Sequence, residues 1–126
     1  MRMTGRVREI IQMNVAGHCI PLVVQGDRVR IFPVYFARIM KENLIAIPVT
    51  GATGIDDALR ERASASALVA DRAGGYEAYV LEGKARYATD ETDYELVAAM
   101  RNEAPGFPIH GAVVFEVEAV HLTPPP

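Results

Sequence analysis

The sequence predicts a mainly β protein, a six-stranded antiparallel barrel with two or three short covering helices. Apolar and polar residues alternate with period two in several short segments, and turn residues separate these segments at short spacing. Few connections are long enough for helical crossovers, which favours antiparallel pairing. At 126 residues the chain is long enough for one core, so we expect a single domain over residues 1–126.

The two ends of the chain differ in character. Val7, Ile10 and Ile11 recur at helical spacing, which predicts an N-terminal helix over residues 1–15. Residues 123–126 end in three prolines, which have no amide N–H for a strand, so this tail is expected to be frayed.

Three strands are expected after the first helix. Residues 18–25 and 29–40 predict a hairpin around a QGDR turn. Pro21 and Pro33 lack the N–H that a strand ladder uses, so each must lie at an edge, at a bulge or with its nitrogen facing away from a partner. Residues 44–50 are almost entirely apolar, which predicts a third strand buried on both faces.

The second half supplies three more strands and two helices. Residues 55–63 predict a short helix after a GATG loop, and residues 66–72 predict the fourth strand. The fifth strand is expected at 76–89 and the last at 111–122. Between them, a helix over residues 90–104 ends at a proline-rich loop.

Gly83 and Asp90 mark two local features of that half. Gly83 interrupts the fifth strand, so we expect a bulge, a bend or a close approach of another backbone there. Asp90 occupies an N-cap position, with Asp93 three residues later. A bent strand that leads into a covering helix is typical of a small barrel.

Charge and composition exclude several kinds of function. The net charge of −3 provides no basic field for nucleic acid. No apolar run reaches the roughly 20 residues that a membrane helix needs, and no signal peptide is recognisable. A single cysteine, Cys19, fits a reducing compartment, so we expect a cytoplasmic protein. His18, Cys19, His110 and His121 lack the spacing of a shared site, so no metal is expected, and no catalytic constellation is recognisable.

Three segments, LIAIPVTGATG, ALRERASASAL and LEGKARYATDETDYELV, taken in this order, resemble the pyridoxamine 5'-phosphate oxidase-like FMN-binding split barrels, especially their small FMN-binding members. The resemblance covers about Ala16 to Leu122. It implies a Greek-key split barrel that forms a homodimer, with FMN in a groove between the subunits. The implied role is electron transfer, with a redox partner protein, or a flavin-dependent oxidoreductase or reductase activity.

The resemblance also assigns a flavin-binding segment by position. The residues expected to meet the ring and phosphate are Pro48, Val49, Thr50, Gly51, Ala52 and Thr53. Such a loop before a helix presents free N–H groups to a phosphate. Tyr35 and Phe107 are candidates to flank the flavin ring, with packing in the barrel or interface as the alternative reading.

The phosphate-binding loop departs from the family pattern. Relatives commonly place Lys or Arg there, whereas this chain has Ile55, Asp56 and Asp57. An arginine from elsewhere is then needed, with Arg62 as our candidate and Arg28, Arg30 and Arg60 as further choices. The alternative hypothesis is a non-enzymatic split-barrel dimer that binds deazaflavin, haem or a partner protein.

Overall fold

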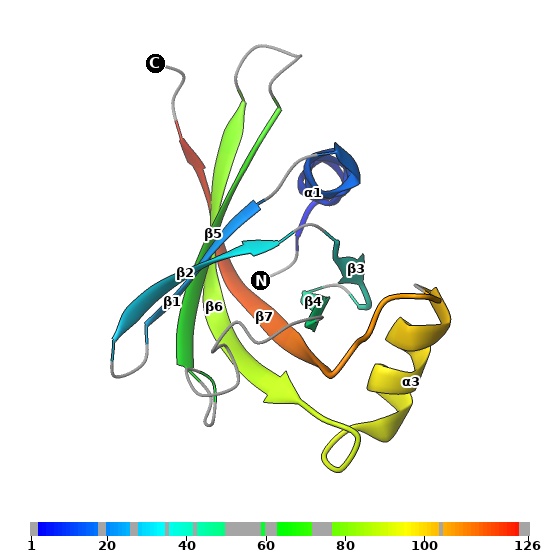
Figure 1. Ribbon diagram of the computed structural model, residues 1–126. Helices are drawn as coiled ribbons and strands as arrows, with labels where there is room; N and C mark the ends of the chain where they lie inside the picture. Colours follow the sequence, from blue (N-terminus) through cyan, green and yellow to red (C-terminus); the bar gives the residue numbers. More distant parts are fainter. Residues whose placement is uncertain are drawn as a thin grey trace.

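The computed structural model describes residues 3–17, 20–25, 28–34, 36–41, 43–49, 59, 63–71, 77–103 and 105–123 (Figure 1). Within these ranges the chain is mainly β, with two helices, as the sequence predicts. In chain order the elements are α1 (Gly5–Gly17), β1 (Ile20–Gln25), β2 (Val29–Val34), β3 (Arg38–Ile39), β4 (Leu44–Val49), β5 (Ala63–Ala70), β6 (Ala78–Ala88), α3 (Tyr94–Glu103) and β7 (Gly111–Thr123). The helix predicted at 55–63 lies outside the described residues, apart from Leu59 and Ala63. The frayed tail predicted at 123–126 is wrong at Thr123, which ends β7 and whose hydroxyl donates to the Ala78 carbonyl oxygen at 3.0 Å; residues 124–126 lie outside the described ranges.

The strands form one antiparallel sheet in the order β2-β1-β5-β6-β7-β4-β3. Its two edge strands are consecutive in the chain, since only residues 35–37 separate Val34 from Arg38. That connection spans at most about 14 Å, whereas the edges of a flat seven-stranded sheet would lie roughly 29 Å apart. The sheet must therefore curl until its edges approach each other. The single strand predicted at 29–40 is wrong in this respect, because the chain leaves one edge after Val34 and joins the other at Arg38.

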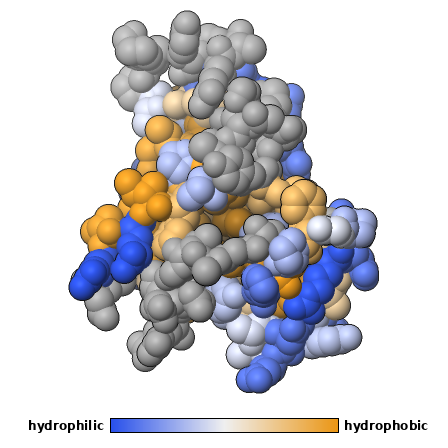
Figure 2. Space-filling model, in the orientation of Figure 1, coloured by the Kyte–Doolittle hydropathy of each residue, from blue (hydrophilic) through white to orange (hydrophobic). Residues whose placement is uncertain are grey.

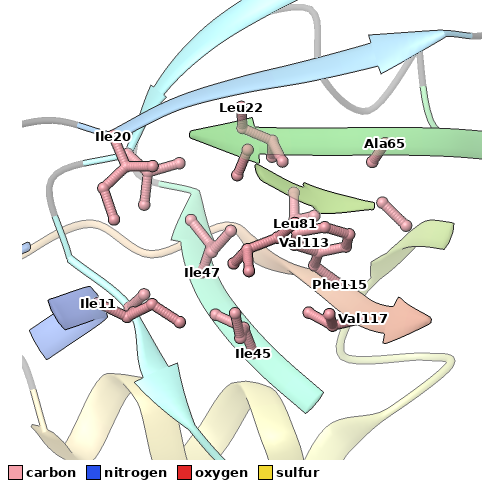
Figure 3. Packing of buried hydrophobic residues seen from close by; sticks show 14 of the residues in the cluster. Ile11, Ile20, Leu22, Ile45, Ile47, Ala65, Leu81, Val113, Phe115 and Val117 are labelled. Carbon is pink, nitrogen blue, oxygen red and sulfur yellow. The ribbon is translucent and has the colours of Figure 1, made fainter. Parts of the chain in front are cut away.

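The inner face of the curled sheet is closed by α1. Figure 3 shows Ile11 of α1 among side chains of β1, β4, β6 and β7, and these residues belong to one buried cluster. Val7 and Ile10 of α1 are at most 1% exposed, as is Phe115 of β7. Burial of this apolar face provides most of the driving force for folding.

The first helix begins later than the sequence predicts. It starts at Gly5, because the Thr4 hydroxyl accepts a hydrogen bond from the Val7 backbone N–H at 3.3 Å. Thr4 therefore acts as an N-cap, and the helix continues to Gly17.

A second buried cluster lies on the outer face, where α3 packs against the strands. Leu96, Val97 and Met100 of α3 are buried against Ala46 of β4 and Val114 of β7. Figure 1 shows α1 and α3 on different sides of the β4 and β7 strands. As expected for residues 44–50, β4 is therefore buried on both faces over most of its described length.

The predicted N-cap at Asp90 is wrong, because α3 begins at Tyr94. The Thr89 and Thr92 hydroxyls accept hydrogen bonds from each other's backbone N–H groups, at 3.2 and 2.9 Å, and hold a turn before the helix. The Val97 N–H then donates to the Asp93 carbonyl oxygen at 3.2 Å, so Asp93 occupies the N-cap position.

Gly83 lies at a β-bulge, as the sequence predicts. The β6–β7 register shifts between Glu82 and Gly83, and Glu118 is the additional residue on β7. A Cβ atom on Gly83 would overlap the Glu116 carbonyl oxygen and lie 2.9 Å from the carbonyl carbon. Only glycine fits this close approach, which bends the longest strand pair and helps the sheet to curl.

An ionic cluster ties α1 to the β5–β6 hairpin. Arg6 of α1 donates to Asp71 at 2.5 Å and to Glu77 at 2.9 Å, while the Tyr79 hydroxyl donates to Glu77 at 2.5 Å. Asp71 is only 6% exposed. The hydrogen bond from Tyr79 and then that from Arg6 lower the pKa of Glu77 from its usual 4.5.

We predict that Gly83→Ala destabilises the protein by about 2–4 kcal/mol, because backbone atoms of β7 must move to admit the methyl group. Denaturant unfolding measures the change. Gly5→Ala is the matched control, since nothing lies within 4 Å of a Cβ there, and it should be neutral or slightly stabilising. A Gly83→Ala variant as stable as the wild type would contradict the close approach.

We also predict that Glu77 stabilises the fold only above acidic pH. Because its pKa is lowered in the folded state, the stability it contributes is present above the unfolded value of 4.5 and is lost as the pH falls through the folded value. Urea unfolding at several pH values should show that the advantage of wild type over Glu77→Gln is constant above about pH 6 and shrinks below about pH 4.5.

Tyr79→Phe removes the largest cause of the lowered pKa but leaves Arg6 in place, so it should reduce the pH dependence only in part. An advantage of wild type over Glu77→Gln that stays the same down to pH 3 would refute this role for the cluster.

Candidate functional site

The candidate site lies at the end of β4, where Pro48 and Val49 meet the start of β7. Pro48 is opposite Ala112 and Val49 is opposite Gly111 in the strand register. The His110 backbone N–H donates to the Val49 carbonyl oxygen at 2.9 Å, which extends the pairing by one residue. The Val49 side chain is buried and Pro48 is half-buried, so the end of this strand is a firm apolar support.

Phe107 lies in the loop that the hydrogen bond between His110 and Val49 joins to β4. Gly106 before it has a φ of 97°, a left-handed conformation that suits glycine. The Ile109 N–H donates to the Phe107 carbonyl oxygen at 2.9 Å, which turns the chain back toward β7. The Phe107 side chain is 66% exposed, so an aromatic ring stands uncovered in the loop beside the end of β4.

Arg101 of α3 holds this loop in place. Its guanidinium donates two hydrogen bonds to the Ile109 carbonyl oxygen, at 3.1 and 3.0 Å. It also forms a bidentate pair with Asp90, at 2.6 and 2.9 Å, and this pairing lowers the pKa of Asp90. One side chain therefore joins the turn before α3 to the loop after it. The sequence does not indicate this role, because the partners Asp90 and Ile109 lie 11 and 8 residues from Arg101 along the chain.

Tyr87 of β6 lies against Gly111, the residue opposite Val49 in the strand register. A Cβ atom on Gly111 would lie 2.5 Å from the Tyr87 hydroxyl oxygen and 2.7 Å from the Ala88 carbonyl oxygen. Position 111 therefore has no room for a side chain. The absence of one lets the phenol of Tyr87 lie directly against the backbone of β7.

Of the predicted site residues, the structure describes Pro48, Val49 and Phe107. Pro48 and Val49 end β4, and Phe107 lies in the loop whose His110 is hydrogen-bonded to Val49. The others lie outside the described residues, namely Tyr35, Thr50, Gly51, Ala52, Thr53 and Arg62. Leu59, from the segment between Val49 and Ala63, is 1% exposed in the inner core.

The described part of the site is apolar and aromatic rather than acidic or basic. It offers a flat aromatic ring, a proline and backbone groups. Over the described ranges, no group of three or more His, Cys, Asp or Glu side chains is arranged to hold a metal ion. Such a surface suits contact with a planar organic ligand that brings its own chemistry.

Comparison with known proteins defines the fold. No protein-family model and no curated protein sequence matches the chain. Among solved structures, HupZ of Group A Streptococcus is 14% identical, with a TM-score of 0.75 over 95% of this chain and 93% of that one. A protein from Lactobacillus delbrueckii assigned as a pyridoxamine 5'-phosphate oxidase is 13% identical, with a TM-score of 0.75 over 95% and 93%.

An FMN-binding protein from Syntrophomonas wolfei is 15% identical, with a TM-score of 0.60 over 93% of this chain and 83% of that one. This chain has the split-barrel fold of the pyridoxamine 5'-phosphate oxidase-like proteins. The fold expected from the resemblance is thereby confirmed.

None of the helices described is both long and apolar enough to cross a membrane.

Proposed function

We propose that this split barrel binds a flavin, FMN, with the isoalloxazine ring against the end of β4 and Phe107. The observation that carries the proposal is the exposed Phe107 ring, attached through His110 to the backbone of Val49. A planar tricyclic ring gains from an aromatic neighbour and from an apolar strand end. The FMN-binding protein of the same fold from Syntrophomonas wolfei supports this choice of ligand.

The proposed role is electron transfer or a flavin-dependent oxidation or reduction. When bound, the flavin supplies the redox chemistry, so the protein needs no catalytic acid or base of its own. The residues described at the site act by holding the ring and by limiting its contact with water. A redox partner protein would then reach the flavin at the exposed edge of the groove.

We further propose that the functional unit is a homodimer. Val29 and Ile31 of β2 are 67% and 68% exposed, and Leu68 of β5 is 48% exposed. The register places Ile31 opposite Val23 and Val23 opposite Ser66, so these side chains share the outer face of three adjacent strands. We call this surface the β2–β1–β5 face.

Figure 2 shows orange atoms beside blue ones along the β1–β2 hairpin, at the left of the view. Arg28 is exposed in the β1–β2 turn, at the rim of the β2–β1–β5 face, whereas the exposed Arg30 faces the opposite side of the strand from Val29 and Ile31. Apolar side chains at the centre with charges at the rim are typical of a protein interface. A second copy seated here would cover the exposed side chains, and the resemblance implies a flavin groove between two such subunits.

A second candidate function rests on the sequence of the phosphate-binding loop. Asp56 and Asp57 occupy positions where relatives carry a cation, and two carboxylates oppose a phosphate dianion. This favours a non-enzymatic dimer that binds a ligand such as haem or deazaflavin. A ligand that binds only the folded protein raises its melting temperature, so a thermal comparison of FMN, deazaflavin and haem separates the two functions.

We predict that purified protein binds FMN and that Phe107→Ala weakens binding by about tenfold, the loss expected for one aromatic contact and its buried area. Quenching of flavin fluorescence measures the affinity. Tyr94→Ala is the matched control, because Tyr94 is also an aromatic residue with 66% exposure but lies at the start of α3. Equal affinities in all three proteins would exclude the proposed ring position, and a protein that takes up no FMN would exclude the function.

We predict that Ile31→Lys converts the dimer to a monomer, because it places a charge at the centre of the β2–β1–β5 face. Light scattering coupled to gel filtration gives the mass. Leu122→Lys is the control, since Leu122 is 64% exposed near the end of β7, and it should remain dimeric. A wild-type protein with the mass of one chain would contradict the dimer.

A further inference from the structure

A pocket of about 740 Å³ opens on the outer face of the sheet, at the end of β4 away from the candidate flavin site. Its size is within the range of small-molecule sites. The residues that line it come from the β3–β4 turn and from three adjacent strands: Lys41, Asn43, Leu44, Lys84, Ala85, Arg86, Val114 and Glu116.

The strand register explains why these residues meet. Lys84 of β6 and Leu44 of β4 are both opposite Glu116 of β7, and Arg86 is opposite Val114 in the next row. Val114 is buried in the cluster under α3 and Leu44 packs against that cluster, whereas Lys84 and Glu116 lie outside it. The pocket therefore opens beside α3, over Lys84 and Glu116.

Hydrogen-bond donors dominate this pocket. Lys41, Lys84 and Arg86 are cationic, and Glu116 is the acid among the lining residues. Lys84 donates to the Ser64 hydroxyl at 2.9 Å, and this uncharged partner does not neutralise it. Arg86 lies 3.5 Å from the Asp93 carboxylate, which is a loose ion pair. Among the described residues at the pocket, with Asp93 counted, three positive charges face two negative ones.

Asn43 adds a positioned donor at the rim. Its side-chain oxygen accepts from the Met3 backbone N–H at 3.2 Å, and its backbone carbonyl accepts from the Val117 N–H at 2.8 Å. Because the oxygen of the amide is occupied, the NH₂ group is the part that Asn43 offers to a ligand. These two contacts hold the residue in place before any ligand binds.

We infer that this pocket binds a small molecule carrying a phosphate monoester, at a site separate from the flavin. Three cations and an amide donor around one opening match a dianion better than a monoanion, and Leu44 supplies an apolar surface for the rest of the molecule. Pro48 lies four residue steps along β4 from Leu44, a distance of about 13 Å, and α3 packs between the two sites. The inference does not depend on the proposed flavin function.

The test is a titration of the full chain with inorganic phosphate in chloride buffer, in which the backbone amide NMR signals are recorded at each phosphate concentration. The expected result is saturable shifts confined to residues 41–44, 84–86 and 114–116. The double variant Lys84→Gln with Arg86→Gln should bind phosphate at least about tenfold more weakly, since two charge-assisted hydrogen bonds are lost. Arg28→Gln with Arg30→Gln removes the same charge from the exposed hairpin and should bind phosphate as the wild type does.

Three outcomes would overturn the inference. They are the absence of saturable shifts in the wild type, shifts spread over basic residues of the whole surface, and equal weakening in the two double variants. The spectrum of each variant also reports whether it is folded. The wild-type titration locates the site without any variant.

An FMN titration of the same proteins separates this inference from the proposed function. Unchanged FMN affinity in the Lys84→Gln, Arg86→Gln protein supports a separate site, and a parallel loss of FMN and phosphate binding overturns it. A wild type that binds phosphate in the pocket but takes up no FMN refutes the proposed function and leaves this inference standing.

Discussion

The short connection between β2 and β3 is the constraint on which the rest of the structure depends. These strands are the two edges of the sheet, yet three residues join them, so the sheet has to curl. Curling creates an inner face, which α1 closes, and an outer face, which α3 covers only in part. The candidate flavin site lies at one end of β4, and the cationic pocket lies at the other.

Local features of this fold could be predicted from the sequence. Period-two alternation identified the strands, and a glycine in the apolar face of β6 indicated the bulge at Gly83. The expectation for the prolines also agrees with the structure, since Pro21 and Pro33 are opposite each other between β1 and the edge strand β2. Neither residue has an N–H to donate, so the pair fits a position where the ladder forms no hydrogen bond.

Features that depend on distant partners could not be predicted. The sequence of residues 29–40 does not show that two separate strands, β2 and β3, lie there. The apolar pattern continues where the chain passes from one edge of the sheet to the other. Asp90 has the character of an N-cap, but it binds Arg101 and the helix starts at Tyr94. The meeting of the outward side chains of β6 with Glu116 and the β3–β4 turn depends on the cross-strand register, which the sequence does not show. Of the predicted flavin segment, the structure describes Pro48 and Val49 at the end of β4.

A crystal structure of the protein crystallised in the presence of FMN tests the central claim most directly. The account predicts a dimer joined through the β2–β1–β5 face, with the isoalloxazine ring between the Phe107 loop and the end of β4. Flavin bound elsewhere on the barrel, or a lone subunit with the β2–β1–β5 face open to solvent, would contradict it.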